Sequence, residues 1–203
     1  MNMQIISLSN QKGGVGKTTT CANLGIGLAR EGKRVLLVDC DPQASLTLSL
    51  GWRKPETLSV TLATLMGRVL QEQPVHAEEA ILHHAEGVDL IPGSIALSGV
   101  EASLDTRQNV LKRVLDDCRK DYSHVLLDCM PSLGMMTINA LAAADSVLIP
   151  TIPHYLSVDG LGKLMESIGR MRRGLNRGLR VEGILITMAS RTTYAREISE
   201  LLR

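Results

Sequence analysis

A glycine-rich stretch near the start of the chain has residue types and spacing suited to phosphate binding. It runs through Lys12, Gly13, Gly14, Val15, Gly16, Lys17, Thr18 and Thr19. The glycines allow a tight turn whose N–H groups point inward, and a helical pattern that begins near Lys17 adds the positive end of its dipole. In the P-loop pattern G-x-x-x-x-G-K-[ST], Lys17 would reach the outer phosphates of a nucleotide and the Thr18 hydroxyl would bind Mg²⁺.

The front of this stretch departs from the P-loop pattern. Where the pattern has its first glycine the sequence has Asn10 and Gln11, and an additional lysine, Lys12, follows them. Lys12 is poorly placed to bind the same phosphates from the same side as Lys17. Spacing alone therefore leaves the role of Lys12 open.

Three aspartates stand where apolar runs end. Asp39 and Asp41 follow the run at residues 35–38, and Asp128 follows the run at residues 125–127. Ligands of open α/β sheets bind at the carboxyl ends of the strands, so these carboxylates are expected near the phosphate loop. We predict that Asp39 and Asp128 belong to a Mg²⁺ site, Asp128 through water, and that Asp41 positions the attacking water. The alternative is that each aspartate only caps the next helix.

The apolar runs alternate with helical patterns along the chain, which is typical of parallel strands covered on both faces. Strands are predicted at residues 3–9, 35–38, 79–83, 88–91, 125–127, 147–149 (closed by Pro150) and 181–187. Helices are predicted at residues 17–30, 44–50, 60–70, 95–104, 110–120, 135–144, 156–173 and 194–203. The pattern predicts an α/β fold with a doubly wound, mainly parallel sheet flanked by helices on both faces, in a single domain over residues 1–203.

Composition excludes several kinds of site. The chain has 203 residues, a formal net charge of +1 and 2% aromatic residues, with no phenylalanine. Bulk charge therefore predicts no particular partner, and stacking of nucleic-acid bases on aromatic side chains is not expected. No stretch is long and apolar enough to span a bilayer, and the first strand begins at the amino terminus, so we expect neither a membrane span nor a signal peptide.

The cysteines and histidines do not suggest a metal centre. The four cysteines form no C-x-x-C pair, so reduced and mostly buried thiols are expected. They are Cys21, Cys40, Cys118 and Cys129. The five histidines are scattered along the chain, which makes a histidine metal site improbable.

Three motifs resemble the ParA/Soj branch of the deviant Walker A ATPases, which are P-loop proteins of the SIMIBI class. They are the glycine-rich stretch at residues 12–19, Val-Asp-Cys-Asp-Pro-Gln at residues 38–43 and Leu-Asp-Cys-Met-Pro-Ser-Leu-Gly at residues 127–134. The resemblance covers essentially the whole chain and implies ATP and Mg²⁺ as cofactors. Lys12 matches the signature lysine of the family, which reaches the nucleotide of the partner subunit in an ATP-sandwich homodimer. A cation delivered in this way stabilises the charge of phosphoryl transfer, so Lys12 and Lys17 both become catalytic candidates.

The resemblance also implies a cellular role. The family positions plasmids and chromosome origins, and its ATP-bound dimers bind DNA without sequence preference at the nucleoid, in the cytoplasm. A ParB- or Spo0J-like activator stimulates the slow hydrolysis and releases the dimer. Adenine contacts are expected from Pro153 and from the loop at Met188, which follow late strands. No membrane partner is expected, because residues 197–203 are too short and too charged to anchor well.

A cluster of arginines near residues 170–177 is the candidate DNA-binding surface. Its members are Arg170, Arg172, Arg173 and Arg177. Contacts to DNA phosphates need clustered positive charge and no readout of bases. The alternative is a solvated helix face whose positive charge complements the dipole at the carboxyl end of the helix.

Departures from the family pattern leave other functions open. Met130 replaces a proline of the third motif, which should loosen the loop after Asp128 because proline restricts φ. The sequence ends at Arg203, where family members continue with a further strand and helices, so we expect a C-terminally short domain. One alternative is therefore a nucleotide-dependent scaffold with little turnover. Another is an amidoligase of the cobyrinic-acid type, which shares the fold but would need an additional substrate domain.

Overall fold

A seven-stranded sheet forms the centre of the computed structural model, which describes residues 3–201 without the side chains of residues 155–159. The strands are β1 (Gln4–Leu8), β2 (Val35–Cys40), β3 (Leu82–His83), β4 (Asp89–Ile91), β5 (His124–Cys129), β6 (Ser146–Thr151) and β7 (Arg180–Ile186). Their order across the sheet is β3-β4-β2-β5-β1-β6-β7. Neighbouring strands are parallel, except for the antiparallel pair β3 and β4. The mainly parallel sheet predicted from the sequence is confirmed.

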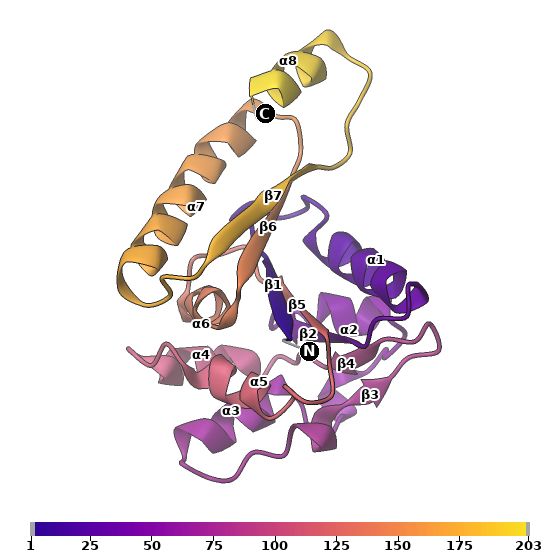
Figure 1. Cartoon of the computed structure of the whole chain (residues 1–203), viewed down its shortest axis with the longest axis vertical. Helices are drawn as coiled ribbons and strands as arrows, with labels where there is room; N and C mark the ends of the chain where they lie inside the picture. The colour runs from indigo at the N-terminus through magenta and orange to yellow at the C-terminus, as the bar shows by residue number, and fades with distance from the viewer. Residues whose placement is uncertain (1–2, 202–203) are drawn as a thin grey trace.

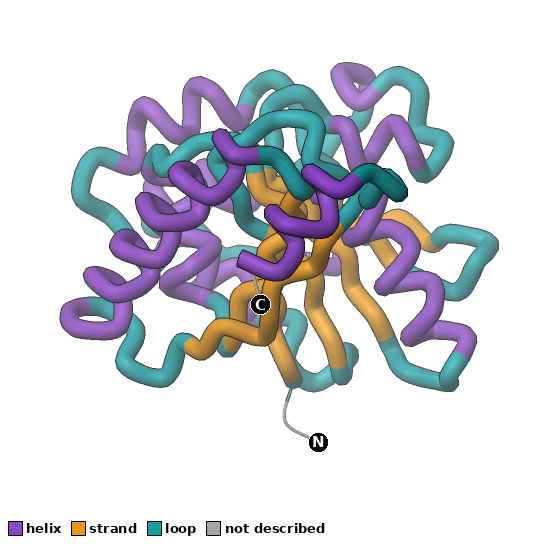
Figure 2. Tube along the Cα trace, turned by 90° about the horizontal axis from the view of Figure 1, so that it is seen from above, coloured by secondary structure: helices purple, strands orange, loops and turns teal. Residues whose placement is uncertain are grey.

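Helices cover both faces of this sheet (Figure 1), and the strands run between two layers of helix (Figure 2). One layer contains α1 (Lys17–Arg30) and α2 (Ser45–Ser49). The other contains α3 (Leu62–Leu70), α4 (Leu97–Leu104), α5 (Val110–Asp116), α6 (Met135–Ala143) and α7 (Tyr155–Gly174). The remaining helices are α8 (Thr193–Leu201) and the short 3₁₀ helices η1 (Pro55–Thr57) and η2 (Ala77–Ala80). Over residues 3–201, none of the helices combines the length and apolarity needed to cross a membrane.

Alternate residues of the central strands face the two helical layers. In β2, Val35 and Leu37 pack with α1, whereas Leu36, Val38 and Cys40 pack into the larger cluster on the opposite face. All of them are almost fully buried. A strand covered on both faces must be apolar at successive positions, which explains the continuous apolar run in the sequence.

The pairing of the strands brings the end of β1 beside two of the predicted aspartates. Leu8 of β1 is the register partner of Asp128, and Asp128 is also the partner of Asp39 in β2. The loop that follows Leu8 therefore starts next to both carboxylates. Parallel pairing alone produces this arrangement, because the three strands end at the same edge of the sheet.

The strand predicted at residues 79–83 is shorter in the structure, and its first residues belong to a 3₁₀ helix. Residues Ala77–Ala80 form the 3₁₀ helix η2, and only Leu82–His83 pair in the sheet. Ala77 and Ala80 are buried, whereas Glu78 and Glu79 between them are exposed. This three-residue period of burial fits a 3₁₀ turn, in which side chains three residues apart share one face.

Pro150 does not close its strand, contrary to the prediction. It lies within β6 and is the register partner of Leu185 in β7. On the other side of β6, β1 ends at Leu8 opposite Leu148. The missing N–H of Pro150 therefore costs no hydrogen bond with β1, and a proline is tolerated there.

Several predicted helix ends are shifted. Helix α3 begins at Leu62 because Thr61 forms a capping box with Thr64. Helix α4 begins at 97 instead of 95, and α5 ends at 116 instead of 120. The last predicted helix is described to Leu201, and its predicted end at residues 202–203 lies outside the described residues.

Candidate functional site

The glycine-rich stretch turns from the end of β1 into the start of α1. Gly14 and Gly16 have φ angles of 70° and 84°, a left-handed conformation that only glycine adopts without strain. The carbonyl of Gly16 accepts a helical hydrogen bond from the Thr20 N–H at 2.8 Å. Among the described residues no side chain caps the amino end of α1, so its first N–H groups remain directed at the site. This geometry suits an anion at the positive end of the helix dipole.

Asn10 occupies the front of the loop and ties it to β6. Its side-chain amide donates to the Pro150 carbonyl at 2.7 Å and to the Thr151 hydroxyl at 3.0 Å. Its amide oxygen accepts from the Lys12 N–H at 3.0 Å. The residue that departs from the P-loop pattern is therefore a buried link between the loop and the sheet. The sequence did not indicate this role, because the partners of Asn10 lie about 140 residues further along the chain.

Thr187, the residue directly after β7, holds the loop on its other side. Its hydroxyl lies 2.8 Å from the Val15 carbonyl and 3.1 Å from the Thr151 carbonyl. Val15 itself is fully buried and is not among the described residues that line the cavity at the loop, so its predicted contact with a nucleotide stays a prediction. The phosphate loop is thus fastened on one side by Asn10 and on the other by Thr187, which makes it preorganised.

Lys17 lies at the start of α1 and is 7% exposed. Its ammonium donates to the Lys12 carbonyl at 3.2 Å. Burial lowers the pKa of Lys17, and the negative charge of Asp128 is the main effect that opposes this. A desolvated ammonium with a single long hydrogen bond can readily exchange that bond for one with a phosphate oxygen.

Asp128 is buried beneath the phosphate loop. Neither of its carboxylate oxygens has a hydrogen-bond partner within residues 3–201. Burial raises the pKa of Asp128 to about 7. The Thr18 hydroxyl and the charge of Lys17 act in the opposite direction, although the Thr18 hydroxyl does not reach regular hydrogen-bond geometry. A buried polar group without a partner is rare in native proteins.

The surroundings of Asp128 fit a hydrated magnesium ion. Mg²⁺ prefers oxygen ligands and keeps several of its waters, so it needs few side chains. Thr18 and Asp128 together would supply a hydroxyl and a carboxylate. In the part of the chain that the structure describes, no cluster of three or more histidine, cysteine or acidic side chains could hold a metal by itself. Water and phosphate oxygens would therefore complete the coordination shell.

Asp39 is equally buried but has partners within the chain. One oxygen accepts hydrogen bonds from the N–H and the hydroxyl of Thr47 at 2.8 and 2.7 Å, and the other accepts from the Asp41 N–H at 3.2 Å. Gly93 packs so closely that a Cβ there would lie 2.9 Å from the Asp39 carboxyl carbon. Burial raises the pKa of Asp39 to about 6, and the Thr47 hydrogen bonds oppose the rise. These contacts favour a positioning role, and the predicted metal contact of Asp39 stays a prediction.

A cavity of about 290 Å³ opens at the loop and brings most of the predicted residues together. From the glycine-rich stretch it is lined by Gly13, Gly14, Gly16, Lys17, Thr18 and Thr19. Asp41 also lines the cavity, and its carboxylate accepts a hydrogen bond from the Gln43 N–H at 2.9 Å. The lining also includes Ser45, Cys129 and Pro131, which were not predicted as site residues. All three lie within or just after the second and third motifs, so their position in these motifs could have indicated them as site residues.

Known proteins show the same sequence pattern over most of this chain. A family model described as an AAA domain matches residues 3–181. The sporulation initiation inhibitor protein Soj of Bacillus subtilis is 42% identical over 193 residues, which is 94% of this chain and 74% of that protein. The chromosome-partitioning ATPase Soj of Thermus thermophilus is 42% identical over 199 residues, 98% of this chain and 75% of that protein. The chain belongs to the Soj/ParA family of partitioning ATPases.

A solved structure confirms the fold of this Soj/ParA chain. It is a cobyrinic acid a,c-diamide synthase from Mycobacterium smegmatis with bound ADP and magnesium, with a TM-score of 0.90 and 39% sequence identity. The match covers 98% of this chain and 80% of that one. A structural neighbour has therefore been crystallised with the nucleotide and the metal ion that the loop and Asp128 fit.

The two predicted adenine contacts of this Soj/ParA chain lie in different environments. Met188 lines the cavity, is 69% exposed and has a φ angle of 51°. Pro153 is buried just after the end of β6 and is not part of the cavity lining. Its contact with a nucleotide stays a prediction.

The predicted DNA-binding arginines lie away from the phosphate loop. They are exposed at the end of α7 and in the connection to β7, which joins the sheet at the amino end of that strand (Figure 1). Arg170 is paired with Glu166 at 2.6 Å, whereas Arg172, Arg173 and Arg177 have no carboxylate partner among the described residues. The cluster therefore keeps most of its positive charge, at the end of the sheet opposite to the nucleotide site.

The four cysteines are buried and unbridged, as expected. Cys129 is the one that reaches the cavity, and its sulfur lies 3.3 Å from the Ser7 hydroxyl. Burial raises the pKa of Cys129 to about 11, so the thiol remains protonated and unreactive at neutral pH.

Proposed function

We propose that this chain is a single-domain, magnesium-dependent ATPase that alternates between an ATP-bound homodimer on DNA and a released form. The observation that carries the proposal is the buried, unpartnered carboxylate of Asp128 beneath a preorganised phosphate loop. Burying a charge without a partner is costly, and a bound cation is the simplest group that would compensate it. The partitioning ATPases among the relatives support the same conclusion.

The side chains of the site divide the work of phosphoryl transfer. The loop N–H groups and Lys17 would bind the phosphates, and Thr18 with Asp128 would hold Mg²⁺, which neutralises charge on the phosphate oxygens when it is bound. Asp41 lines the cavity with a partly exposed carboxylate, so we assign it the positioning of the attacking water. Proximity and electrostatic stabilisation then supply most of the rate enhancement.

Lys12 has a different role in this proposal. Its backbone is hydrogen-bonded within the loop, since its carbonyl accepts from Lys17 and its N–H donates to the Asn10 side chain. Its side chain would reach the nucleotide of a second copy, which makes ATP a bridge between two subunits. Hydrolysis would then be slow unless the dimer and a ParB-like activator hold Lys12 in place.

The partners follow from the family and from the charge distribution. The exposed arginines at the end of α7 would bind DNA phosphates without sequence preference. A ParB- or Spo0J-like activator would stimulate hydrolysis and release the dimer, so the protein would act at the nucleoid, in the cytoplasm, in partitioning plasmids or chromosomes.

The experiment that tests this function is ATP hydrolysis with Mg²⁺ alone, with duplex DNA, and with DNA plus the amino-terminal peptide of the cognate ParB-like protein. We expect slow turnover alone and clear stimulation in the complete mixture. An Asp41→Ala variant should still bind ATP but lose the stimulated turnover. Background hydrolysis in every mixture would contradict the proposal and favour a nucleotide-dependent scaffold. Normal hydrolysis by Asp41→Ala would contradict the role of Asp41.

One other candidate function is that of an amidoligase acting on cobyrinic acid, because the structural neighbour is a cobyrinic acid a,c-diamide synthase. This chain covers 80% of that protein, so both share the nucleotide-binding part. The two functions differ in what stimulates ATP consumption. Stimulation by glutamine and cobyrinic acid, with no response to DNA and peptide, would favour the amidoligase.

A further inference from the structure

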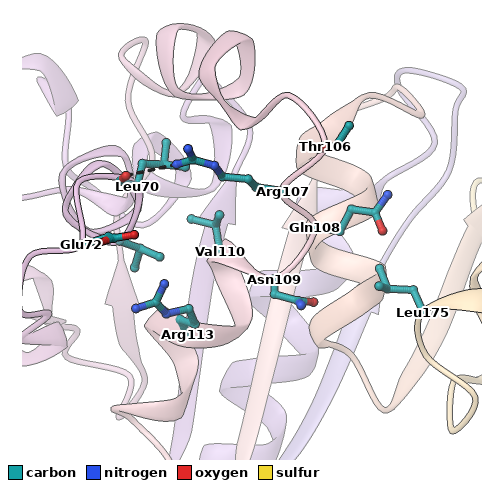
Figure 3. A pocket seen from close by; sticks show the side chains of 10 residues that line it. Leu70, Glu72, Thr106, Arg107, Gln108, Asn109, Val110, Arg113 and Leu175 are labelled. Atoms are coloured by element: carbon teal, nitrogen blue, oxygen red, sulfur yellow. Dashed lines mark hydrogen bonds between the residues drawn. The ribbon is translucent and has the colours of Figure 1, made fainter.

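A second pocket lies outside the nucleotide site, with a volume of about 550 Å³. It is bounded by the end of α3, the segment that joins α4 to α5, the first turn of α5 and Leu175 after α7 (Figure 3). It has no lining residue in common with the phosphate-loop cavity. Its volume is within the range of pockets that bind small molecules.

Two guanidinium groups give this pocket its chemical character. Arg107 and Arg113 line it from the same side, and both side chains point toward the end of α3 (Figure 3). Arg107 donates to the Leu70 carbonyl at 3.1 Å, which holds its guanidinium in place and leaves further N–H donors unused. Within the described residues, neither arginine is paired with a carboxylate. Glu72 is the single acidic residue among the described residues of the lining, so this lining carries a net positive charge.

The rest of the lining adds neutral polar side chains and the apolar side chain of Leu175. The side chains of Thr106, Gln108 and Asn109 line the pocket, and none of them forms a hydrogen bond within residues 3–201. Gln108 and Asn109 lie on the side of Leu175, opposite the two arginines (Figure 3). Positive charge on one side and neutral donors on the other would suit an elongated ligand with oxyanion groups at both ends.

The rim of the pocket combines an unusual backbone conformation with hydrogen bonds to a buried side chain. Asp105, next to Thr106, has φ 47° and ψ −110°. Asn139 of α6 is fully buried, donates to the Arg107 carbonyl at 3.0 Å and accepts from the Val110 N–H at 2.9 Å. A strained backbone persists only where its surroundings determine it, and such positions gather at binding sites. The rim is therefore a built feature of the fold.

We propose that this pocket binds a small anion with two oxyanion groups, carboxylate or phosphate, through Arg107 and Arg113. The planar guanidinium group binds either oxyanion with two parallel hydrogen bonds, so both ligand types share this chemistry. A volume of about 550 Å³ suits a small molecule and not an extended phosphodiester chain such as DNA. The site is separate from ATP binding and does not depend on it.

The test is isothermal titration of the full chain with citrate and, separately, with inorganic pyrophosphate, in saturating ADP. The same excess of Mg²⁺ is kept in cell and syringe, because both probes bind Mg²⁺ and the phosphate loop must stay filled. We expect at least one of the two to bind, and Arg113→Gln to weaken that binding by about tenfold or more, because one charge-assisted contact is lost. Citrate binding alone would identify a carboxylate ligand, and pyrophosphate binding alone a phosphate ligand.

Lys112→Gln is the matched control, because Lys112 is an exposed cation next to Arg113 that does not line the pocket. Its affinity for the same probe should equal that of the unmodified protein. Absence of binding by both probes would overturn the proposal, as would equal weakening by the two variants. If only the affinity for duplex DNA responds to Arg113→Gln, the pocket belongs to a nucleic-acid surface and the proposal is also wrong.

Discussion

At the residue scale, Asp128 connects stability to function. Its pKa in the folded protein is about 7, against an ordinary value of 3.8, because the carboxylate is buried without a partner. The folded state therefore binds the proton more tightly than the unfolded state, and stability is lost as the pH rises from about 4 through 7. The same carboxylate that would hold Mg²⁺ is thus a source of instability when the site contains no cation.

We therefore predict that Asp128→Asn stabilises the protein at pH 8 in the absence of nucleotide and Mg²⁺, by up to about 4 kcal/mol. At pH 4 the two proteins should have similar stability, because the carboxyl is then protonated. Urea unfolding at both pH values measures the difference. Parallel pH profiles of the two proteins would contradict the assigned pKa. The variant should lose ATP hydrolysis at either pH.

At the element scale, the packing of α1 on β2 positions the phosphate loop. A Cβ at Gly25 would lie 2.6 Å from a methyl carbon of Leu37, and Leu37 is fully buried. Gly27 lies on the same helix but is exposed, with nothing within 4 Å of a Cβ at that position. Substitutions at the two glycines therefore distinguish the effect of close packing from the effect of helix propensity.

Gly25→Ala should destabilise the protein by about 1–3 kcal/mol, because the added methyl overpacks a filled core. Gly27→Ala, the matched control, should stabilise it by about 0.5–1 kcal/mol through helix propensity and reduced freedom of the unfolded chain. Chemical denaturation of both variants measures the two free energies of unfolding. Equal effects in the two variants would mean that α1 is not held as closely to β2 as described.

At the scale of the whole molecule, the proposed dimer depends on Lys12. Lys12→Ala should abolish ATP-dependent dimerisation, because the ATP bound by each subunit loses its contact with the other. Light scattering coupled to size exclusion, with and without ATP, measures the mass. Lys33→Ala removes an exposed lysine beyond the far end of α1 and should leave dimerisation unchanged. A dimer that persists in Lys12→Ala would refute the role across the interface.

The distribution of charge over the molecule gives a second prediction at this scale. Arg172→Ala combined with Arg173→Ala should weaken binding to duplex DNA and flatten its dependence on salt, because fewer counterions are released. The control replaces Arg53 and Lys54, an exposed cationic pair elsewhere on the surface, by alanine. Fluorescence anisotropy over a salt series measures both. Identical salt slopes for all three proteins would assign DNA binding to another surface.

Local patterns in the sequence were sufficient for much of the fold. The bounds of α1, 17–30, were predicted as the structure has them, because a glycine-rich turn precedes the helix and Gly32 follows it. The mainly parallel sheet followed from apolar runs that need cover on two faces. The errors at residues 79–83 and at Pro150 arose where local residue type was overruled by what lies on the neighbouring strand or in the core.

The sequence by itself determined the phosphate loop and the aspartates at the strand ends, since both depend on residues close together along the chain. Only the tertiary structure decided that Asp39 bonds to Thr47 while Asp128 has no partner, although both follow similar apolar runs. It also decided that Thr187 closes the loop, through a hydrogen bond to a residue 172 positions away. Hydrogen bonds and burial depend on which segments the fold brings together, and no local pattern contains that information.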